Sequence, residues 1–396
     1  MKTRRKSIVL YTLLAFSSLI VYLPVMYHAS RFHSDFGSHI ERALKMPHDL
    51  DHVSSPLFHA VFLLVFRFAD LAPRDAAFIA ILLAMVPVPL IAFAVFSRCA
   101  GEHLPDSVLM AVAFGLAIMS PISIWTNPHL LGYLNSIVYH NPTSITVRLF
   151  VIPVSILAFR SFQYQPYRSL NHRVYELLLS AVMVSLMNLA KPSLALALLP
   201  GCCLFAIWRY LRRGSVDWAR LVVGIMLPAI LMLGLFALIS YVDFDDGSAI
   251  EIGFLTFMTQ HVPAWRIPIQ FMLSIVFPVG VCLLYAKQAS RNHFLIFAWT
   301  VFACAILVTY GLFESGPRFL HGNFLWTSYG AVFLLMFAST QFLLEQYVRE
   351  LQFPHSDFRI FGLRFSRRFA FATVLFGLHV ISGIGYGLRF LTYELF

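Results

Sequence analysis

The chain has 396 residues, of which 59% are hydrophobic and 12% are charged, and its mean hydropathy is +0.76. An average soluble domain carries about 25% charged residues, so the composition excludes a soluble globular protein and predicts an integral membrane protein. The formal net charge of +10 would suit nucleic acid in a soluble protein. Here the basic residues cluster in short loops between apolar runs, as the positive-inside rule expects, and we expect no nucleic-acid partner.

Apolar runs long enough to cross a bilayer as helices recur along the whole chain. The first, Ser7 to Met26, is long for a signal peptide and lacks a small-residue cleavage site, which favours a retained transmembrane helix. We predict an all-α, polytopic membrane protein of about eleven transmembrane helices, within a range of 10 to 13, with residues 1–396 forming a single domain. The predicted spans are 7–26, 75–97, 106–125, 144–160, 174–190, 192–208, 219–241, 267–286, 293–312, 323–345 and 369–388.

The stretch 56–71, PLFHAVFLLVFRFADL, is short and contains Arg67 and Asp70, so it either crosses the membrane or lies in its surface. If it lies in the surface, 19 of the 29 Lys and Arg residues fall on the cytoplasmic side, against 11 if it crosses. The positive-inside rule favours the surface location. Residues 27–74 then form a long first outer loop with interfacial helices, and the N-terminus is cytoplasmic in a multi-pass protein of the cytoplasmic (inner) membrane.

This first loop contains a dense group of acids and histidines. Asp35 closely follows the first helix, and a carboxylate at the membrane surface is suited to act as a base. Asp35 and His39 are four residues apart and would share a helical face, with Glu41 close by; a solvated loop is the alternative. His33, Asp35 and His39 could also bind zinc or manganese. Their spacing matches no strong metal motif, so we assign no metal ligand and leave a divalent metal open as the only cofactor to consider.

The segment 125–144, WTNPHLLGYLNSIVYHNPTS, is predicted to lie on the outer side of the membrane, as the first loop does, and it contains both aromatic and polar side chains. His129, Asn135, His140 and Asn141 could donate or accept hydrogen bonds with sugar hydroxyls, and aromatic rings could contact sugar faces. This composition suits the acceptor side of a carbohydrate site. It equally suits an interfacial loop anchored by aromatic residues.

Three residues with nitrogen-containing side chains are candidates for binding phosphate on the outer side of the membrane. Arg318 and His321 lie in FESGPRFLHGNFLW, and a guanidinium suits bidentate phosphate recognition. Lys191 lies in NLAKPSLA, where Pro192 is expected to start a new helix. The alternatives are an Arg318–Glu314 salt bridge and a Lys191 side chain that extends towards lipid headgroups.

The order of these features resembles that of the GT-C-type membrane glycosyltransferases, which include the protein O-mannosyltransferase and aminoarabinose-transferase branches. The resemblance rests on an N-terminal in-to-out helix, an acid that opens the first outer loop (HSDFGSHIERA) and a Pro-Leu-aromatic helix start (SSPLFHAVF). A Lys-containing helix junction (LMNLAKPSLALAL) and a late loop (SGPRFLHGNF) add to it. The frequent Asp-Glu pair of that family is here Asp35-Phe36.

The resemblance implies that Asp35 is the catalytic base, which deprotonates an acceptor hydroxyl as a sugar leaves a polyprenyl-phosphate donor. The expected partners are this donor, a glycan, lipid or protein acceptor, and membrane lipid. A transporter or flippase for lipid-linked glycans is the main alternative, with Arg148 as the nearest charge to the membrane interior. A glycan polymerase or ligase and a non-catalytic assembly subunit are further alternatives.

Overall fold

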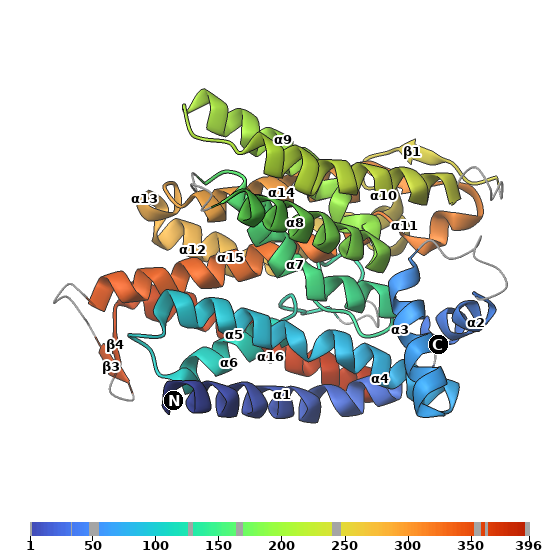
Figure 1. Ribbon diagram of the computed structural model, residues 1–396, viewed down its shortest axis with the longest axis horizontal. Coiled ribbons are helices and arrows are strands. Elements are labelled where there is room, and N and C mark those ends of the chain that lie inside the picture. Colours follow the sequence, from blue (N-terminus) through green and yellow to red (C-terminus); the bar gives the residue numbers. More distant parts are fainter. Residues whose placement is uncertain are drawn as a thin grey trace.

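The protein is a bundle of long helices that run side by side (Figure 1). The computed structural model describes residues 2–32, 34–46, 55–125, 130–163, 169–239, 247–351, 358–360 and 363–392, with side chains for all of these except 2–7, 358–360 and 363–365. Only short strands accompany the helices in the described residues, so the prediction of an all-α polytopic protein is confirmed.

The α-helices are α1 (Lys2–Ala29), α2 (Phe36–Lys45), α3 (Pro56–Ala69), α4 (Pro73–Met85), α5 (Pro87–Ala100), α6 (Asp106–Ile118), α7 (Pro142–Arg160), α8 (Leu170–Ala190), α9 (Ala195–Leu211), α10 (Leu227–Ala237), α11 (Thr256–His261), α12 (Arg266–Leu284), α13 (Ala286–Ala289), α14 (His293–Gly311), α15 (Leu325–Leu351) and α16 (Arg367–Thr392). The other elements are the 3-10 helices η1 (Pro192–Leu194) and η4 (Gly316–His321), the π-helical segment η2 (Arg220–Met226), and the strands β1 (Ile250–Ile252), β2 (Leu312–Glu314), β3 (Phe358–Ile360) and β4 (Leu363–Phe365).

Ten helical segments of the described chain are long and apolar enough to cross a membrane, and each overlaps one predicted span. The predicted span 106–125 is the exception. Its helix, α6, has 13 residues and ends at Ile118, so it is too short to cross alone.

Three helices begin after residues whose side chains cap the helix N-terminus. The side chains of Asn141, Ser169 and Asn292 each accept a hydrogen bond from the backbone N–H three residues later.

The described residues that lead from α6 to α7, 119–125 and 130–141, form a largely buried, non-helical segment. In a membrane protein such backbone is tolerated only where other groups satisfy its N–H and C=O groups. Here α12 and α16 supply them. The Ser120 N–H donates to the carbonyl of His379 at 3.1 Å, the Ile122 N–H to the carbonyl of Leu273 at 3.2 Å, and the Leu134 N–H to the Ser274 hydroxyl at 2.9 Å. The segment is therefore a fixed part of the bundle interior.

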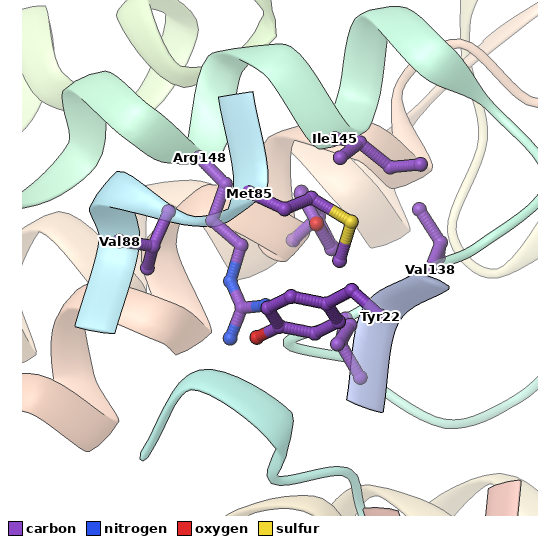
Figure 2. Close-up of a pocket in the computed structure, with 8 residues that line it drawn as sticks. Tyr22, Met85, Val88, Val138, Ile145 and Arg148 are labelled. Carbon is purple, nitrogen blue, oxygen red and sulfur yellow. The ribbon is translucent and has the colours of Figure 1, made fainter. Parts of the chain in front are cut away.

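The guanidinium of Arg148 caps the C-terminal end of α6. It donates to the carbonyls of Ala117 at 2.7 Å and Leu116 at 3.2 Å, and it lies 4.1 Å from the Phe333 ring centroid. Figure 2 shows Arg148 and Tyr22 pointing towards each other in a small internal pocket, and the Tyr22 hydroxyl also donates to Ala117. A cation suits this position because unpaired carbonyls at a helix C-terminus carry partial negative charge.

The two ends of the bundle differ in what they contain. The first residues of α1, the short α13 and the β3–β4 hairpin lie at one end, which we call the N-terminal end (Figure 1). Helices α2, α3 and α11 and the β1–β2 hairpin lie at the other, which we call the α2–α3 end. The antiparallel β1–β2 pair sets Glu251 opposite Phe313.

Helix α3 corresponds to the ambiguous stretch 56–71. It has 14 residues and crosses the direction of the long helices at the α2–α3 end (Figure 1), as a helix lying in the membrane surface would. It ends at Asp70, whose φ of +48° terminates the helix, and Pro73 then begins α4. Helices α4 and α5 form one long apolar segment, Pro73–Ala100, which is interrupted only at Pro87.

Candidate functional site

Asp35 lies at the α2–α3 end, where it is held by the start of α7. It is the N-cap residue of α2, but its side chain makes no cap hydrogen bond to that helix. Its carboxylate instead accepts a hydrogen bond from the Asn141 side-chain amide at 2.7 Å, and its backbone N–H donates to the His140 carbonyl at 3.1 Å. An amide-to-carboxylate bond of this kind contributes about 1.5–3 kcal/mol, so it helps to hold the carboxylate against the start of α7.

Asn141 is itself fixed in orientation. Its side-chain carbonyl accepts hydrogen bonds from the Ser144 N–H at 2.9 Å and the Thr143 hydroxyl at 2.8 Å. Because the carbonyl oxygen is engaged on this side, the NH₂ group must face Asp35. Asn141 and Thr143 are both buried, so the start of α7 forms a rigid base beneath the carboxylate.

Lys191 lies between two spans, at the junction of α8 and η1. The following Pro192 disfavours helical backbone at Lys191, whose φ of −168° and ψ of 125° are extended. Its ammonium donates to the Thr143 hydroxyl at 3.4 Å and lies 4.4 Å from the Trp326 ring centroid. Removal from water lowers the pKa of Lys191 to about 7, and the nearby Asp35 charge opposes that shift only in part.

The site therefore joins four separate parts of the chain: the start of α2, the start of α7, the α8–η1 junction and the start of α15. The His140 ring extends it, with its centroid 5.8 Å from that of Trp326. The Asp35 carboxylate lies close enough to the Lys191 ammonium to affect its pKa, which is about 7. Each group has its own hydrogen-bond partner, Asn141 for Asp35 and Thr143 for Lys191. Such a pair can accept a proton and bind an anion at the same time.

His39 follows Asp35 by one helical turn. It is buried, its backbone N–H donates to the Asp35 carbonyl at 3.0 Å, and its ring contacts the ring of His59 on α3. Glu41, the other predicted residue of α2, is exposed. Within the described residues, no group of three or more His, Cys, Asp or Glu side chains is arranged to hold a metal. His33, the third residue of the metal alternative, lies outside that description.

The other predicted residues have different surroundings. His129 lies outside the described residues. Asn135 is buried in the segment before α7, and its side-chain carbonyl accepts from the Ile137 N–H at 3.1 Å, which shapes that segment. Arg318 and His321 lie on η4, whose backbone is tied to the residues before β1: the Arg318 N–H donates to the Ser248 hydroxyl at 3.3 Å. The structure thus brings together Asp35, His39, His140, Asn141 and Lys191.

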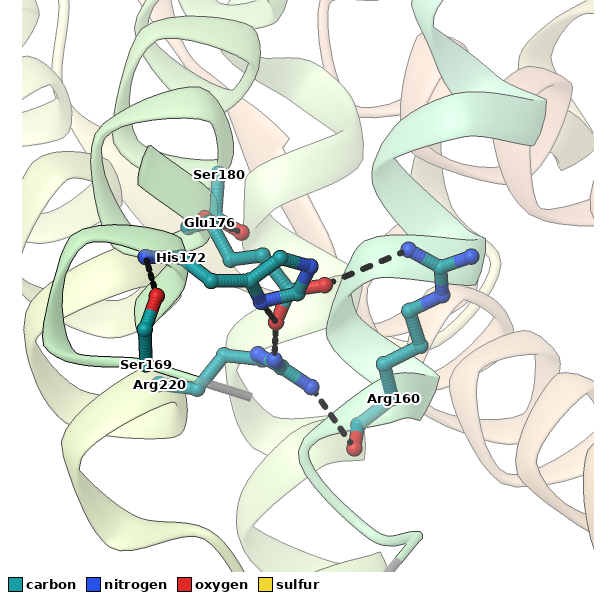
Figure 3. A network of polar contacts seen from close by, with 6 residues as sticks. All are labelled: Arg160, Ser169, His172, Glu176, Ser180 and Arg220. Carbon is teal, nitrogen blue, oxygen red and sulfur yellow. Dashed lines mark hydrogen bonds and ion pairs between the residues drawn. The ribbon is translucent and has the colours of Figure 1, made fainter. Parts of the chain in front are cut away.

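Sequence reasoning missed three members of this site and one network elsewhere. Thr143, His59 and Trp326 are single polar or aromatic residues at the starts of apolar helices, so nothing in their spacing marks them. At the N-terminal end, the Glu176 carboxylate on α8 pairs with the buried Arg220 and lies 3.8 Å from Arg160 (Figure 3). Figure 3 also shows His172 beside Glu176. This network joins α7, α8 and η2.

No protein-family model matches the chain, and no curated protein matches it. The fold and the apolar helices define the protein as an all-α, multi-pass membrane protein.

Proposed function

We propose that the protein is a membrane glycosyltransferase that moves a sugar from a polyprenyl-phosphate donor to an acceptor at the outer face of the cytoplasmic membrane. The observation that carries the proposal is the Asp35–Asn141–Thr143–Lys191 arrangement at one end of a membrane-spanning bundle. The resemblance to GT-C-type enzymes adds to it, because it assigns the first-loop acid the role of base.

The chemistry follows from the two charged groups. The donor's tail stays in lipid, so its phosphate lies near the membrane surface, where the spans end. Lys191 binds this phosphate and stabilises the charge that grows on it as the sugar leaves. Asp35 takes the proton of the acceptor hydroxyl. The new bond forms between the acceptor oxygen and the anomeric carbon, while the anomeric carbon–oxygen bond to the phosphate breaks and its electron pair stays on the phosphate.

Charge supports the orientation of this site. The N-terminal end contains the last turns of α5, α7 and α9 and the start of η2, with Arg98, Arg160, Arg209 and Arg220, as well as Lys287 on α13. The positive-inside rule assigns such an end to the cytoplasm. The α2–α3 end, with the site, then faces outwards.

The transporter alternative predicts charged or broken helices inside the membrane. The end of α6 at Ile118, inside the bundle, is a break of this kind, so the alternative stays untested. The charge nearest to the interior is that of Arg148. Its guanidinium caps α6 and contacts Phe333, which explains its presence without a transport path. A glycan polymerase or ligase would use the same donor class and the same outer site, and such proteins usually have a larger late outer loop than residues 242–266 provide.

The test is binding of a lipid phosphate by purified protein in nanodiscs. We expect wild type to bind a polyprenyl monophosphate more tightly than the same polyprenol without phosphate. Lys191→Met should weaken this binding by about 10- to 100-fold, the value of one hydrogen bond to a charged group. Lys45→Met, an exposed lysine on α2, is the matched control and should bind as wild type does. Equal binding of the two lipids, or wild-type binding by Lys191→Met, would contradict the proposal.

A further inference from the structure

Arg266, at the start of α12, packs against two tryptophans. Its Cζ atom is 5.3 Å from the Trp125 ring centroid and 5.1 Å from that of Trp265. The two indole rings meet edge-on, with their centroids 5.5 Å apart and an interplanar angle of 86°. Both cation distances lie within the range of about 6 Å over which an aromatic ring attracts a cation. We call these three side chains the Arg266 cluster.

The aromatic contacts leave the hydrogen-bond donors of this guanidinium without acceptors. Within the described part of the chain, the guanidinium makes no hydrogen bond or ion pair. Arg389, at the end of α16, shows the contrast: its side chain donates to the Ser123 hydroxyl at 2.7 Å and to the Gly385 carbonyl at 3.3 Å. A guanidinium has five N–H donors in one plane. Those of Arg266 are therefore available to an anion.

Arg266 lies at the depth of a lipid headgroup. It is the first residue of the membrane-crossing stretch Arg266–Leu284. Helix α12 leads into α13, which lies at the N-terminal end, so α12 begins at the α2–α3 end, where α11 also lies (Figure 1). The headgroups of a bilayer lie where spans end. Tryptophans are enriched at this depth because the indole is apolar but has one polar N–H.

An exposed apolar stripe runs along α12 from the Arg266 cluster. Trp265, Ile269 and Met272 are 60%, 42% and 47% exposed. Their spacing of four and three residues sets them on one face of the helix. This face belongs to a membrane span, so it contacts lipid chains. A ligand with an anionic head and an apolar chain fits both parts of this surface, with its head at Arg266 and its chain on Ile269 and Met272.

We propose that the Arg266 cluster binds the phosphate of a glycerophospholipid in the leaflet at the α2–α3 end, with one acyl chain along the α12 stripe. The site shares no residue with the arrangement around Lys191, and the inference does not depend on the proposed function. The backbone N–H of Trp125 donates to the Tyr133 hydroxyl at 3.1 Å. A lipid bound here therefore also fixes the start of α12 to the segment that leads to α7.

The first test measures lipid binding by the full-length protein in a neutral detergent, using native mass spectrometry. The probes are dioleoylphosphatidylglycerol and dioleoylglycerol, which has the same chains without phosphate. We expect wild type to bind the phospholipid more tightly, and Arg266→Gln to weaken this binding by about 10- to 100-fold, the value of one hydrogen bond to a charged group. Trp265→Leu should weaken it by about 2- to 30-fold. Arg67→Gln removes the same charge from an exposed position on α3 and should bind as wild type does.

Three results of this test would overturn the inference. They are equal binding of the two lipids by wild type, wild-type binding of phosphatidylglycerol by Arg266→Gln, and an equal loss in Arg67→Gln, which would show a general effect of charge. Arg266→Lys keeps the charge and removes the planar donor group. If Arg266→Gln does not fold, weaker binding by Arg266→Lys supports the inference and wild-type binding contradicts it.

A second set of probes separates this site from the proposed donor site. Lys191→Met should bind phosphatidylglycerol as wild type does, and Arg266→Gln should bind polyprenyl monophosphate as wild type does. If Arg266→Gln instead loses polyprenyl monophosphate and keeps phosphatidylglycerol, Arg266 belongs to the donor site and the inference fails. Inorganic phosphate should not displace phosphatidylglycerol, because it has no acyl chain; displacement would contradict a lipid site. Absence of polyprenyl monophosphate binding by wild type, with Arg266-dependent phosphatidylglycerol binding, would contradict the proposed function and support this site.

Discussion

Replacement of Lys191 by methionine should stabilise the fold while it weakens lipid-phosphate binding. The pKa of this lysine falls from 10.5 to about 7, and each unit corresponds to about 1.4 kcal/mol. Holding the charged ammonium in the folded protein therefore costs at most about 5 kcal/mol. Methionine has a similar length and needs no charge, so this cost disappears.

The pH dependence follows from the direction of the shift. Between pH 7 and 10.5 the unfolded chain binds more protons at Lys191 than the folded protein does, so wild-type stability rises with pH over this window. The cost is complete below pH 7 and vanishes above pH 10.5. It should decrease by about 3 kcal/mol between pH 6 and pH 9. The contact with Trp326 and the bond to Thr143 offset part of the gain, by about 1 kcal/mol each.

Denaturant unfolding in detergent at pH 6 and pH 9, followed by tryptophan fluorescence, measures this difference. We expect Lys191→Met to be more stable than wild type at pH 6, with a smaller advantage at pH 9. Lys45→Met should show neither effect. A variant that is less stable than wild type at pH 6, or an advantage that does not change with pH, would refute the reasoning that Lys191 is a costly charge retained for binding.

Four further substitutions test other parts of the account. Asp35→Asn should reduce sugar transfer by about 100- to 10,000-fold and leave lipid-phosphate binding intact; loss of binding instead would show that Asp35 is not the base. Glu176→Gln leaves Arg220 buried without its charged partner, so it should destabilise the fold by about 3–5 kcal/mol in denaturant titrations without altering lipid binding. Arg148→Met should also reduce stability, because α6 loses its cap; unchanged unfolding would contradict that role. Arg318→Ala should weaken use of the donor more than use of the acceptor in steady-state kinetics, and an equal loss of both would argue against a phosphate contact.

The sequence predicted the membrane class and most spans because apolar run length is a local property. The end of α6 was not predictable in this way. Residues 119–125, MSPISIW, contain Pro121, which disfavours helical backbone at Ser120. Their backbone bonds to α12 and α16 instead of continuing α6. Run length took no account of this proline. The span 106–125 was therefore predicted too long.

The candidate site was predicted as separate residues and not as a constellation. Asp35, Asn141 and Lys191 stood out because polar groups at the ends of apolar runs are few. Their pairing depends on which helix ends meet, and the chain order alone does not set this. Trp326 and His59 carry no signal of their own in the sequence, since an aromatic or a histidine at the start of an apolar helix is ordinary at a membrane surface.

The most direct test of the central claim compares surface glycans and lipid-linked sugars by mass spectrometry in cells that contain wild type, Asp35→Asn or no protein. The account predicts that Asp35→Asn removes one sugar from the glycan and that the lipid-linked donor accumulates, as in the deletion. A glycan altered by the deletion but unchanged by Asp35→Asn would contradict it, because the carboxylate would then have no part in the reaction.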